Sequence, residues 1–327
     1  MIARIAGQRA EVETVTTVGP ADARLKRLLV NLHEQAADKV LRGAVAQCDG
    51  RVFPKVRVAD VLSIDRSGVS DEEYRYALRA HFDFLVASAE GDPHFAVEFD
   101  EPYHRISAAA KRRDAIKDAL CRRFELPLLR VGAQELTRYD QFTVLGWLAE
   151  AWFLHRWYEQ EKAAGRIDYY DSFSPIFFYR TLPDGREDHP WDLGWEARRL
   201  IAAAWRKGQC GFGLEHVIQV PPPHEGYNTA YALLGLGSMG VSGNSVGDGV
   251  LIGEATLKVH DWVPSCDRDL VEGLSERAVG VKLRRYLRGE IGPDPPQRLA
   301  EIRRLTAAQS WVRCGSLLDD IPDRQRS

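Results

Sequence analysis

Acidic side chains gather in one short stretch of the sequence, which contains the runs HFDFLVA and HFAVEFD separated by SAEGDP. Both runs alternate apolar with polar residues, and the segment between them is rich in turn residues. This combination is typical of a β-hairpin. If Ala87 pairs with His94 across the turn, side chains that alternate between the faces of each strand fall into two sets. One face then carries four polar side chains: His81, Asp83, Glu98 and Asp100.

Three carboxylates on one face of a hairpin repel one another unless a positive charge lies between them. Residues opposite each other on paired strands lie about 5 Å apart at Cβ, and neither run contains Lys or Arg. Oxygen ligands of this kind suit Mg²⁺ or Mn²⁺. The pattern therefore predicts a metal site formed by Asp83, Glu98 and Asp100. The alternative is a solvated polar face on an edge hairpin, because a slip of one residue in register would scatter the cluster.

The segments around the hairpin predict the order helix, strand, hairpin, helix, strand. A long amphipathic helix is expected over residues 20–45, and it carries Glu34, which is either a site residue or a surface glutamate. A strand is expected over residues 51–58, where Pro54 favours an edge position or a bulge. A helix over residues 108–124 and a buried strand, ELPLLRV, follow the hairpin.

Basic residues outnumber acidic ones after the hairpin. Between residues 101 and 130 the chain has eight Lys or Arg and four Asp or Glu. Arg113 and Lys117 flank the apolar stripe of the predicted helix, whereas Asp114 is expected to point further toward solvent. A basic rim beside an acidic centre suits a phosphodiester backbone. The alternative is an ordinary solvated basic helix face.

The composition is that of a soluble globular protein. The chain has 327 residues, of which 45% are hydrophobic and 28% are charged, enough for one large or two average domains. The net charge of −3 argues neither for nor against a polyanionic partner. Five scattered cysteines without a CxxC pair disfavour a zinc ribbon or a disulfide framework. The N-terminus lacks the apolar core of a signal peptide, and VLGWLAEAWFL is too short to span a bilayer. A cytoplasmic protein without membrane contact is expected.

The predicted order of helix, strand, hairpin, helix and strand, with its acidic and basic residues, resembles the PD-(D/E)XK, or restriction-endonuclease-like, nuclease superfamily. The similarity covers residues from about 22 to 135 and is greatest to a branch of uncharacterised domains related to very-short-patch-repair endonucleases. That branch has an acid on the first helix, Asp-Phe on a strand, an acid-x-Asp strand, a His after a short loop, a basic helix and a strand ending in Leu-Arg. This sequence has, in the same order, Glu34, Asp83-Phe84, Glu98-Phe99-Asp100, His104, Arg113 to Lys117, and Leu129-Arg130.

The resemblance implies a restriction-endonuclease-like α/β core that hydrolyses phosphodiester bonds of nucleic acid, with DNA favoured, using Mg²⁺ or Mn²⁺. Asp83 and Glu98 would hold the ion, and Asp100 and His104 would complete the pocket. Glu34 and Arg113 would be accessory residues.

One departure from the superfamily signature matters. The usual lysine two residues after the second acid is replaced by Asp100, as it is in the related branch. Lys117, Lys55 or His104 must then take its role. If none does, the domain is catalytically silent and binds nucleic acid or a protein partner.

The second half, residues 136–327, is expected to be an accessory α+β region, with residues 1–135 forming the nuclease-like domain. Its first helix is rich in Trp, and core packing against the first half is favoured over base stacking. The sequence Gly235-x-Gly237-x-x-Gly240 is followed by more glycine, so a turn-rich loop is favoured over a nucleotide site. The spacing of His216, His224 and Glu225 matches no metal motif, which favours surface histidines.

Overall fold

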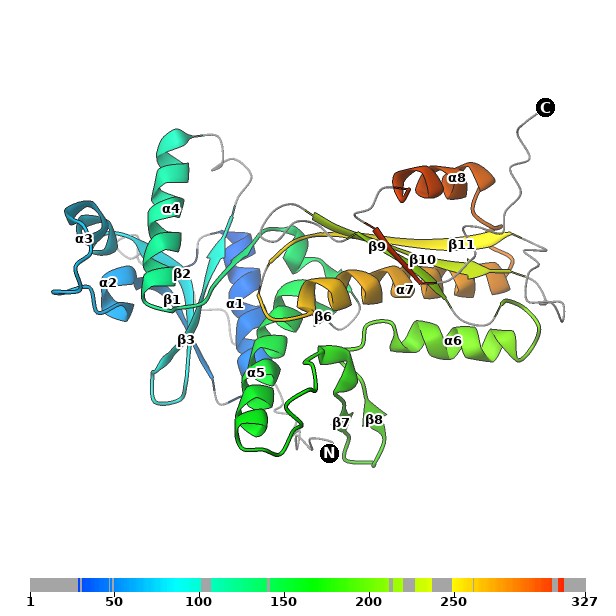
Figure 1. Cartoon of the computed structure of the whole chain (residues 1–327), viewed down its shortest axis with the longest axis horizontal. Coiled ribbons are helices and arrows are strands. Elements are labelled where there is room, and N and C mark those ends of the chain that lie inside the picture. Colours follow the sequence, from blue (N-terminus) through cyan, green and yellow to red (C-terminus); the bar gives the residue numbers. More distant parts are fainter. Residues whose placement is uncertain are drawn as a thin grey trace, which may run out of the picture. The chain divides into compact units, whose positions relative to one another are not determined.

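The structure, a computed structural model, describes residues 29, 31–46, 48, 50–100, 107–139, 142–211, 214–219, 227–236, 249–260, 262–307 and 311–314. The chain forms two compact units that divide after Ala163. They are called here the N-terminal unit and the C-terminal unit. The fold is mixed α/β, and its N-terminal unit contains a mixed sheet flanked by helices (Figure 1). Among the described residues, no helix is both long enough and apolar enough to cross a membrane.

The sheet of the N-terminal unit has four strands in sequence order. They are β1 (Arg51–Arg57), β2 (His81–Ala87), β3 (Pro93–Phe99) and β4 (Leu128–Val131). The first three run antiparallel, and β4 pairs parallel with β3. A parallel neighbour requires a crossover connection, which here contains helix α4 (Ala108–Arg123). The expected order of helix, strand, hairpin, helix and strand is therefore present, and β1 with Pro54 lies at an edge as predicted.

Helices cover the two faces of this sheet. The remaining helices of the unit are α1 (Leu32–Val45), α2 (Val58–Val61), α3 (Asp71–Ala77), α5 (Val144–Ala163) and the 3₁₀ turn η2 (Gln134–Leu136). Ala96 belongs to a buried cluster with Leu120 of α4. Its neighbour Phe95 lies 4.9 Å from Trp152 of α5, measured between ring centroids. Since neighbouring side chains on a strand point to opposite faces, α4 covers one face and α5 the other.

The hairpin therefore differs from the predicted one. The alternating pattern predicted one apolar and one polar face, but β2 and β3 are buried on both faces over most of their length. Their polar character is confined to one end, near Asp83 and Glu98. Small and apolar side chains such as Leu85 and Ala96 fill the face that was expected to be polar.

The Trp-rich helix α5 packs against α1 and belongs to the N-terminal unit. Trp147 and Trp152 are buried, which confirms the prediction that they are core residues. The compact unit thus ends at Ala163, whereas the sequence placed a boundary at residue 135. A short two-stranded ladder of β5 (Arg138–Tyr139) and β6 (Phe142–Thr143) precedes the helix.

The C-terminal unit is built on a second antiparallel sheet, ordered β11-β10-β9-β12. Its strands are β9 (Glu215–Gln219), β10 (Tyr227–Gly235), β11 (Val250–Lys258) and β12 (Trp311–Cys314). Its helices are α6 (Trp195–Trp205), α7 (Cys266–Leu287) and α8 (Pro296–Leu305). The unit also contains the 3₁₀ turn η3 (Pro175–Phe177) and the strands β7 (Arg180–Thr181) and β8 (Glu187–Asp188). The glycine-rich run begins at the end of β10, and Gly237 and Gly240 lie outside the described residues.

Helix α7 lies against the second sheet on one face, and α8 covers the other face. Two glycines make the close approach of α7 possible. A Cβ on Gly253 of β11 would overlap the Ser275 carbonyl oxygen, and one on Gly280 would lie 2.7 Å from Ala197 Cβ of α6. Helix α7 is thus packed closely between the sheet and α6.

Candidate active site at the end of the hairpin

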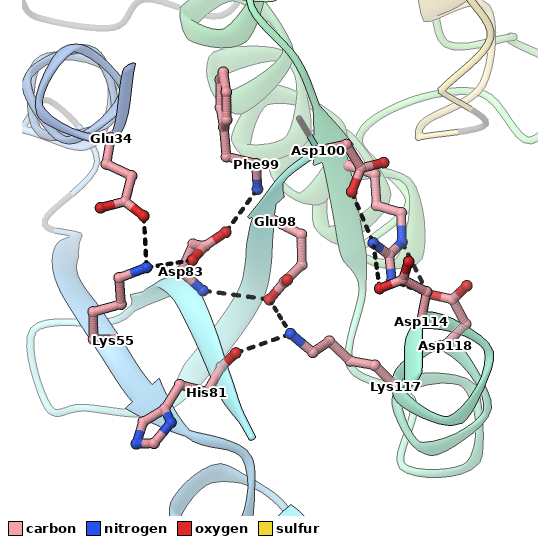
Figure 2. A network of polar contacts seen from close by, with 11 residues as sticks. Glu34, Lys55, His81, Asp83, Glu98, Phe99, Asp100, Asp114, Lys117 and Asp118 are labelled. Atoms are coloured by element: carbon pink, nitrogen blue, oxygen red, sulfur yellow. Dashed lines mark hydrogen bonds and ion pairs between the residues drawn. The ribbon is translucent and has the colours of Figure 1, made fainter. Parts of the chain in front are cut away.

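Asp83 and Glu98 lie beside each other at the polar end of the hairpin. The backbone N–H of Asp83 donates to Glu98 Oε1 at 3.3 Å, and the N–H of Phe99 donates to Asp83 Oδ2 at 2.9 Å (Figure 2). The ladder ends at the pair Phe84–Val97, and its register places Asp83 opposite Glu98, as expected.

The pair used to set the register was wrong, because Ala87 pairs with Pro93 instead of His94. A bulge between Val86 and Ala87 accounts for the difference.

A buried lysine contacts one of these acids. Lys117 lies on α4, and its Nζ is 2.6 Å from Glu98 Oε1. The same ammonium donates to the carbonyl oxygen of His81 at 2.9 Å. Burial raises the pKa of Glu98 to about 7, and the charge of Lys117 opposes this rise. The expectation that Lys117 reaches the site from the neighbouring helix is met in the structure.

A second lysine lies between Asp83 and the first helix. Lys55 Nζ is 2.6 Å from Asp83 Oδ1 and 2.7 Å from Glu34 Oε1 (Figure 2). Glu34 is in the first turn of α1. The sequence left open whether Glu34 points to the site or to solvent, and the ion pair brings it to the site.

Lys55 has an unusual backbone conformation for a residue within a strand. Its φ is 55°, in the left-handed region, although it lies within strand β1. The ladder to β2 pairs Pro54 with Phe84 and Val56 with Phe82 and skips the residue between them. A non-glycine residue in this conformation costs about 1–2 kcal/mol. Such strain often marks functional positions.

Asp100 belongs to a separate ion-pair network. Arg130 of β4 reaches Asp100 Oδ1 at 3.0 Å and Asp118 Oδ1 at 2.9 Å, and lies 3.8 Å from Asp114 Oδ1. Within the described residues, Asp83, Glu98 and Asp100 do not bring one oxygen each within 4.8 Å of one another. The expected trio is thus divided, because a parallel strand supplies an arginine that the hairpin sequence does not contain.

The remaining expected residues lie in different places. Arg113 is exposed on α4, and Asp114, expected to point further toward solvent, is half exposed and lies at the edge of the Arg130 network. His104 lies outside the described residues. Part of the predicted basic rim is engaged in ion pairs, as for Arg112 with Glu72. The sequence analysis took Arg130 as one charge of that rim and as the end of the closing strand, and missed its ion pairs with Asp100 and Asp118.

Residues 26–143 match a family described as "Protein of unknown function (DUF2726)". The match includes all five charged residues of the hairpin site: Glu34, Lys55, Asp83, Glu98 and Lys117. No curated protein and no solved structure matches the chain significantly. The similarity therefore covers the N-terminal sheet with α1 to α4, ends just before α5, and assigns no activity.

Proposed function

We propose that the N-terminal unit is a metal-dependent nuclease of the PD-(D/E)XK kind, which hydrolyses phosphodiester bonds of nucleic acid. The observation that carries the proposal is the placement of Asp83 and Glu98 side by side with the buried Lys117 on Glu98. The strand order and the parallel β4 after α4 also agree with the topology that the sequence resemblance implies.

The donor atoms of this site fit a hard divalent cation. Asp83 and Glu98 offer only oxygen atoms, which suit Mg²⁺ or Mn²⁺. Glu98 uses Oε1 for both of its contacts, and within the described residues Oε2 has no hydrogen bond or ion pair. Both oxygens of Asp83 have partners, but an ionised carboxylate accepts about four hydrogen bonds. Asp100, held by Arg130, would act outside this pair of ligands.

The bound ion would supply an activated water and would stabilise charge on the phosphate. The chain's own residues position the two ligands and place positive charge beside them. Lys117 is held by Glu98 and the His81 carbonyl, so its ammonium is fixed next to the ligand pair. An ammonium at this place suits stabilisation of the anionic transition state. His104 remains a sequence-based candidate for proton transfer.

A catalytically silent domain that binds nucleic acid or a protein partner is the second candidate. One observation favours it, namely the position of Lys55 between Asp83 and Glu34. The negative charges of the three carboxylates in the site are nearly balanced by the two lysine ammonium groups, without any metal ion. In a silent domain, this network would serve only to hold α1 and α4 on the sheet.

Cleavage assays on the full chain test the proposal. Plasmid DNA, single-stranded DNA and RNA would be incubated with Mg²⁺ or Mn²⁺, and with EDTA as a metal-free control. Asp83→Asn should lower the metal-dependent rate at least about 100-fold, the scale of losing an essential active-site group. Asp92→Asn is a matched control at the opposite, exposed end of the hairpin and should cut normally.

Two outcomes would contradict the nuclease proposal. One is an Asp83→Asn variant with the wild-type rate, since contaminating nuclease or another site would then explain the cleavage. The other is a protein that cuts none of the substrates with either ion. If such a protein still binds DNA or RNA in a fluorescence anisotropy titration, the silent nucleic-acid-binding domain is the correct alternative.

A further inference from the structure

The C-terminal unit contains a second group of side chains of the kinds that bind metal ions. His216 of β9 and Glu272 and Glu276 of α7 each offer one ligand atom, and these atoms lie within 4.8 Å of one another. Over the part of the chain that the structure describes, this is the one group of three or more such residues. The residues are far apart in sequence and are brought together by the packing of α7 on the sheet.

The geometry of the elements explains the convergence. Residues four apart lie on the same face of a helix, so Glu272 and Glu276 both face the sheet. On β9, Ile218 contacts Val271 of α7, and His216, two residues earlier, points to the same side. His216 Nε2 is 2.8 Å from Glu276 Oε1, and Nδ1 is 3.8 Å from Glu272 Oε1.

The imidazole nitrogen nearest to Glu276 has no hydrogen bond. His216 Nε2 is buried, and although Oε1 of Glu276 is close, the two groups are not aligned as donor and acceptor. A buried polar atom without a hydrogen bond costs about 1–3 kcal/mol. Two ligand atoms bound to one tetrahedral ion, each about 2.1 Å from it, are about 3.4 Å apart. The observed 2.8 Å between His216 Nε2 and Glu276 Oε1 is shorter than this value, so the two groups would move slightly apart to admit the ion.

Glu276 is fixed by partners on its other oxygen. Oε2 accepts from Arg198, which also pairs with Asp192. A Cβ on Gly194 would overlap Oε2, so the absence of a side chain there creates the space for the carboxylate. Hydrogen-bonded partners of this kind orient carboxylates that bind metal ions. Oε1 is thereby turned toward His216.

We propose that His216, Glu272 and Glu276 form a binding site for a divalent transition metal ion, with Zn²⁺ the best fit. One imidazole nitrogen and two carboxylate oxygens are ligands that zinc commonly uses. Three protein ligands leave one coordination position open, as in catalytic zinc sites. The side chains of His216 and Glu272 are 14% and 28% exposed, so this position is reachable from solvent. The site is independent of the proposed nuclease site.

Zinc titration of the full chain tests the assignment. The chain would carry Asp83→Asn to remove the hairpin site, and bound metal would be removed with a chelator first. Isothermal titration calorimetry should show one Zn²⁺ per chain, and bound Co²⁺ should give the visible absorption of a site with a nitrogen ligand. Glu272→Gln and His216→Gln should each weaken Zn²⁺ binding by at least about 100-fold, more than the loss of an outer partner.

Matched controls and a mild variant keep the test decisive. Glu196→Gln on α6 and His155→Gln on α5 change the same residue types elsewhere and should leave zinc affinity unchanged. Glu272→Gln keeps the side-chain shape at a partly exposed position, so circular dichroism should show an intact fold. Unaltered zinc affinity in both ligand variants would overturn the proposal, as would a dissociation constant weaker than about 100 μM. The cluster would then be a metal-free ion pair.

Discussion

Replacing Lys117 with Met should reveal how strongly the buried ion pair stabilises the N-terminal unit. Methionine keeps the length of the side chain and removes its charge. The side chains of Lys117 and Glu98 are only 8% and 12% exposed, so Glu98 would lose its nearest cation in a poorly solvated place. Removing one partner of a buried pair costs about 3–5 kcal/mol when the other stays charged.

The cost should depend on pH, because Glu98 can take up a proton instead. Burial already raises its pKa from 4.5 to about 7, and loss of Lys117 raises it further. The folded chain therefore binds a proton that the unfolded chain releases, so stability falls as pH rises above about 4.5. In the wild type this fall ends near pH 7, and in the variant it continues. Each further pH unit costs the variant about 1.4 kcal/mol.

Measurements at two pH values separate the contribution of the Lys117 hydrogen bond from that of its charge. At pH 6 Glu98 is protonated in both proteins, and the variant loses mainly the hydrogen bond from Lys117 to the His81 carbonyl, about 1 kcal/mol. At pH 8.5 about 2 kcal/mol is added, giving about 3 kcal/mol in all. Urea unfolding in EDTA, followed by circular dichroism and tryptophan fluorescence, measures both values.

A double-mutant cycle provides the control. In a Glu98→Gln background no carboxylate remains at this position, so Lys117→Met should cost about 1 kcal/mol at either pH. An equal loss at pH 6 and pH 8.5, or an equal loss in both backgrounds, would refute the reasoning. The ammonium would then contribute through packing or its backbone hydrogen bond alone.

Two further changes test other parts of the fold. Burial raises the pKa of Asp269 to about 6, and its hydrogen bond from Ser174 opposes the rise. Ionised Asp269 therefore destabilises the folded chain; this effect is absent below about pH 4 and complete above about pH 6. Asp269→Asn should therefore raise unfolding free energy by up to about 3 kcal/mol at pH 7 and hardly at all at pH 4; a pH-independent gain in urea titrations would contradict this. Trp152→Ala should cost about 3–5 kcal/mol because this buried ring packs on Phe95. Trp205→Ala, at a 42% exposed position, should cost much less in the same assay, and equal costs would contradict the packing argument.

The hairpin and the pairing of its acids were predictable because strand periodicity leaves few choices. The assumed register placed Asp83 opposite Glu98, and it holds at this end because the bulge after Val86 lies at the other end of the ladder, next to the turn. The burial of both faces was not predictable, because Leu85 and Ala96 look neutral in a pattern dominated by Phe and charged residues. Their burial depends on α4, which is packed there by tertiary contacts.

Residues that act over long sequence distances were harder to assign. Lys55 was a candidate for the missing lysine. It contacts Glu34 and Asp83 while its own backbone is left-handed, a conformation that the strand pattern did not predict. Asp100 was placed with the hairpin acids because its partner lies on β4, thirty residues later. His216 was considered beside His224 and Glu225, its neighbours in sequence, whereas its partners are two glutamates of α7.

The two candidate sites follow one physical rule. A buried carboxylate needs a cation nearby. In both units a basic residue far away in sequence supplies this cation and contacts only one of the two carboxylate oxygens. Lys117 contacts Oε1 of Glu98, and Arg198 contacts Oε2 of Glu276. The other oxygen of Glu276, Oε1, faces His216. The other oxygen of Glu98, Oε2, has no hydrogen bond or ion pair among the described residues. Each unit therefore positions its carboxylate before any metal ion binds, so a chelator should stop the proposed cleavage and remove the proposed zinc ion while leaving the protein folded.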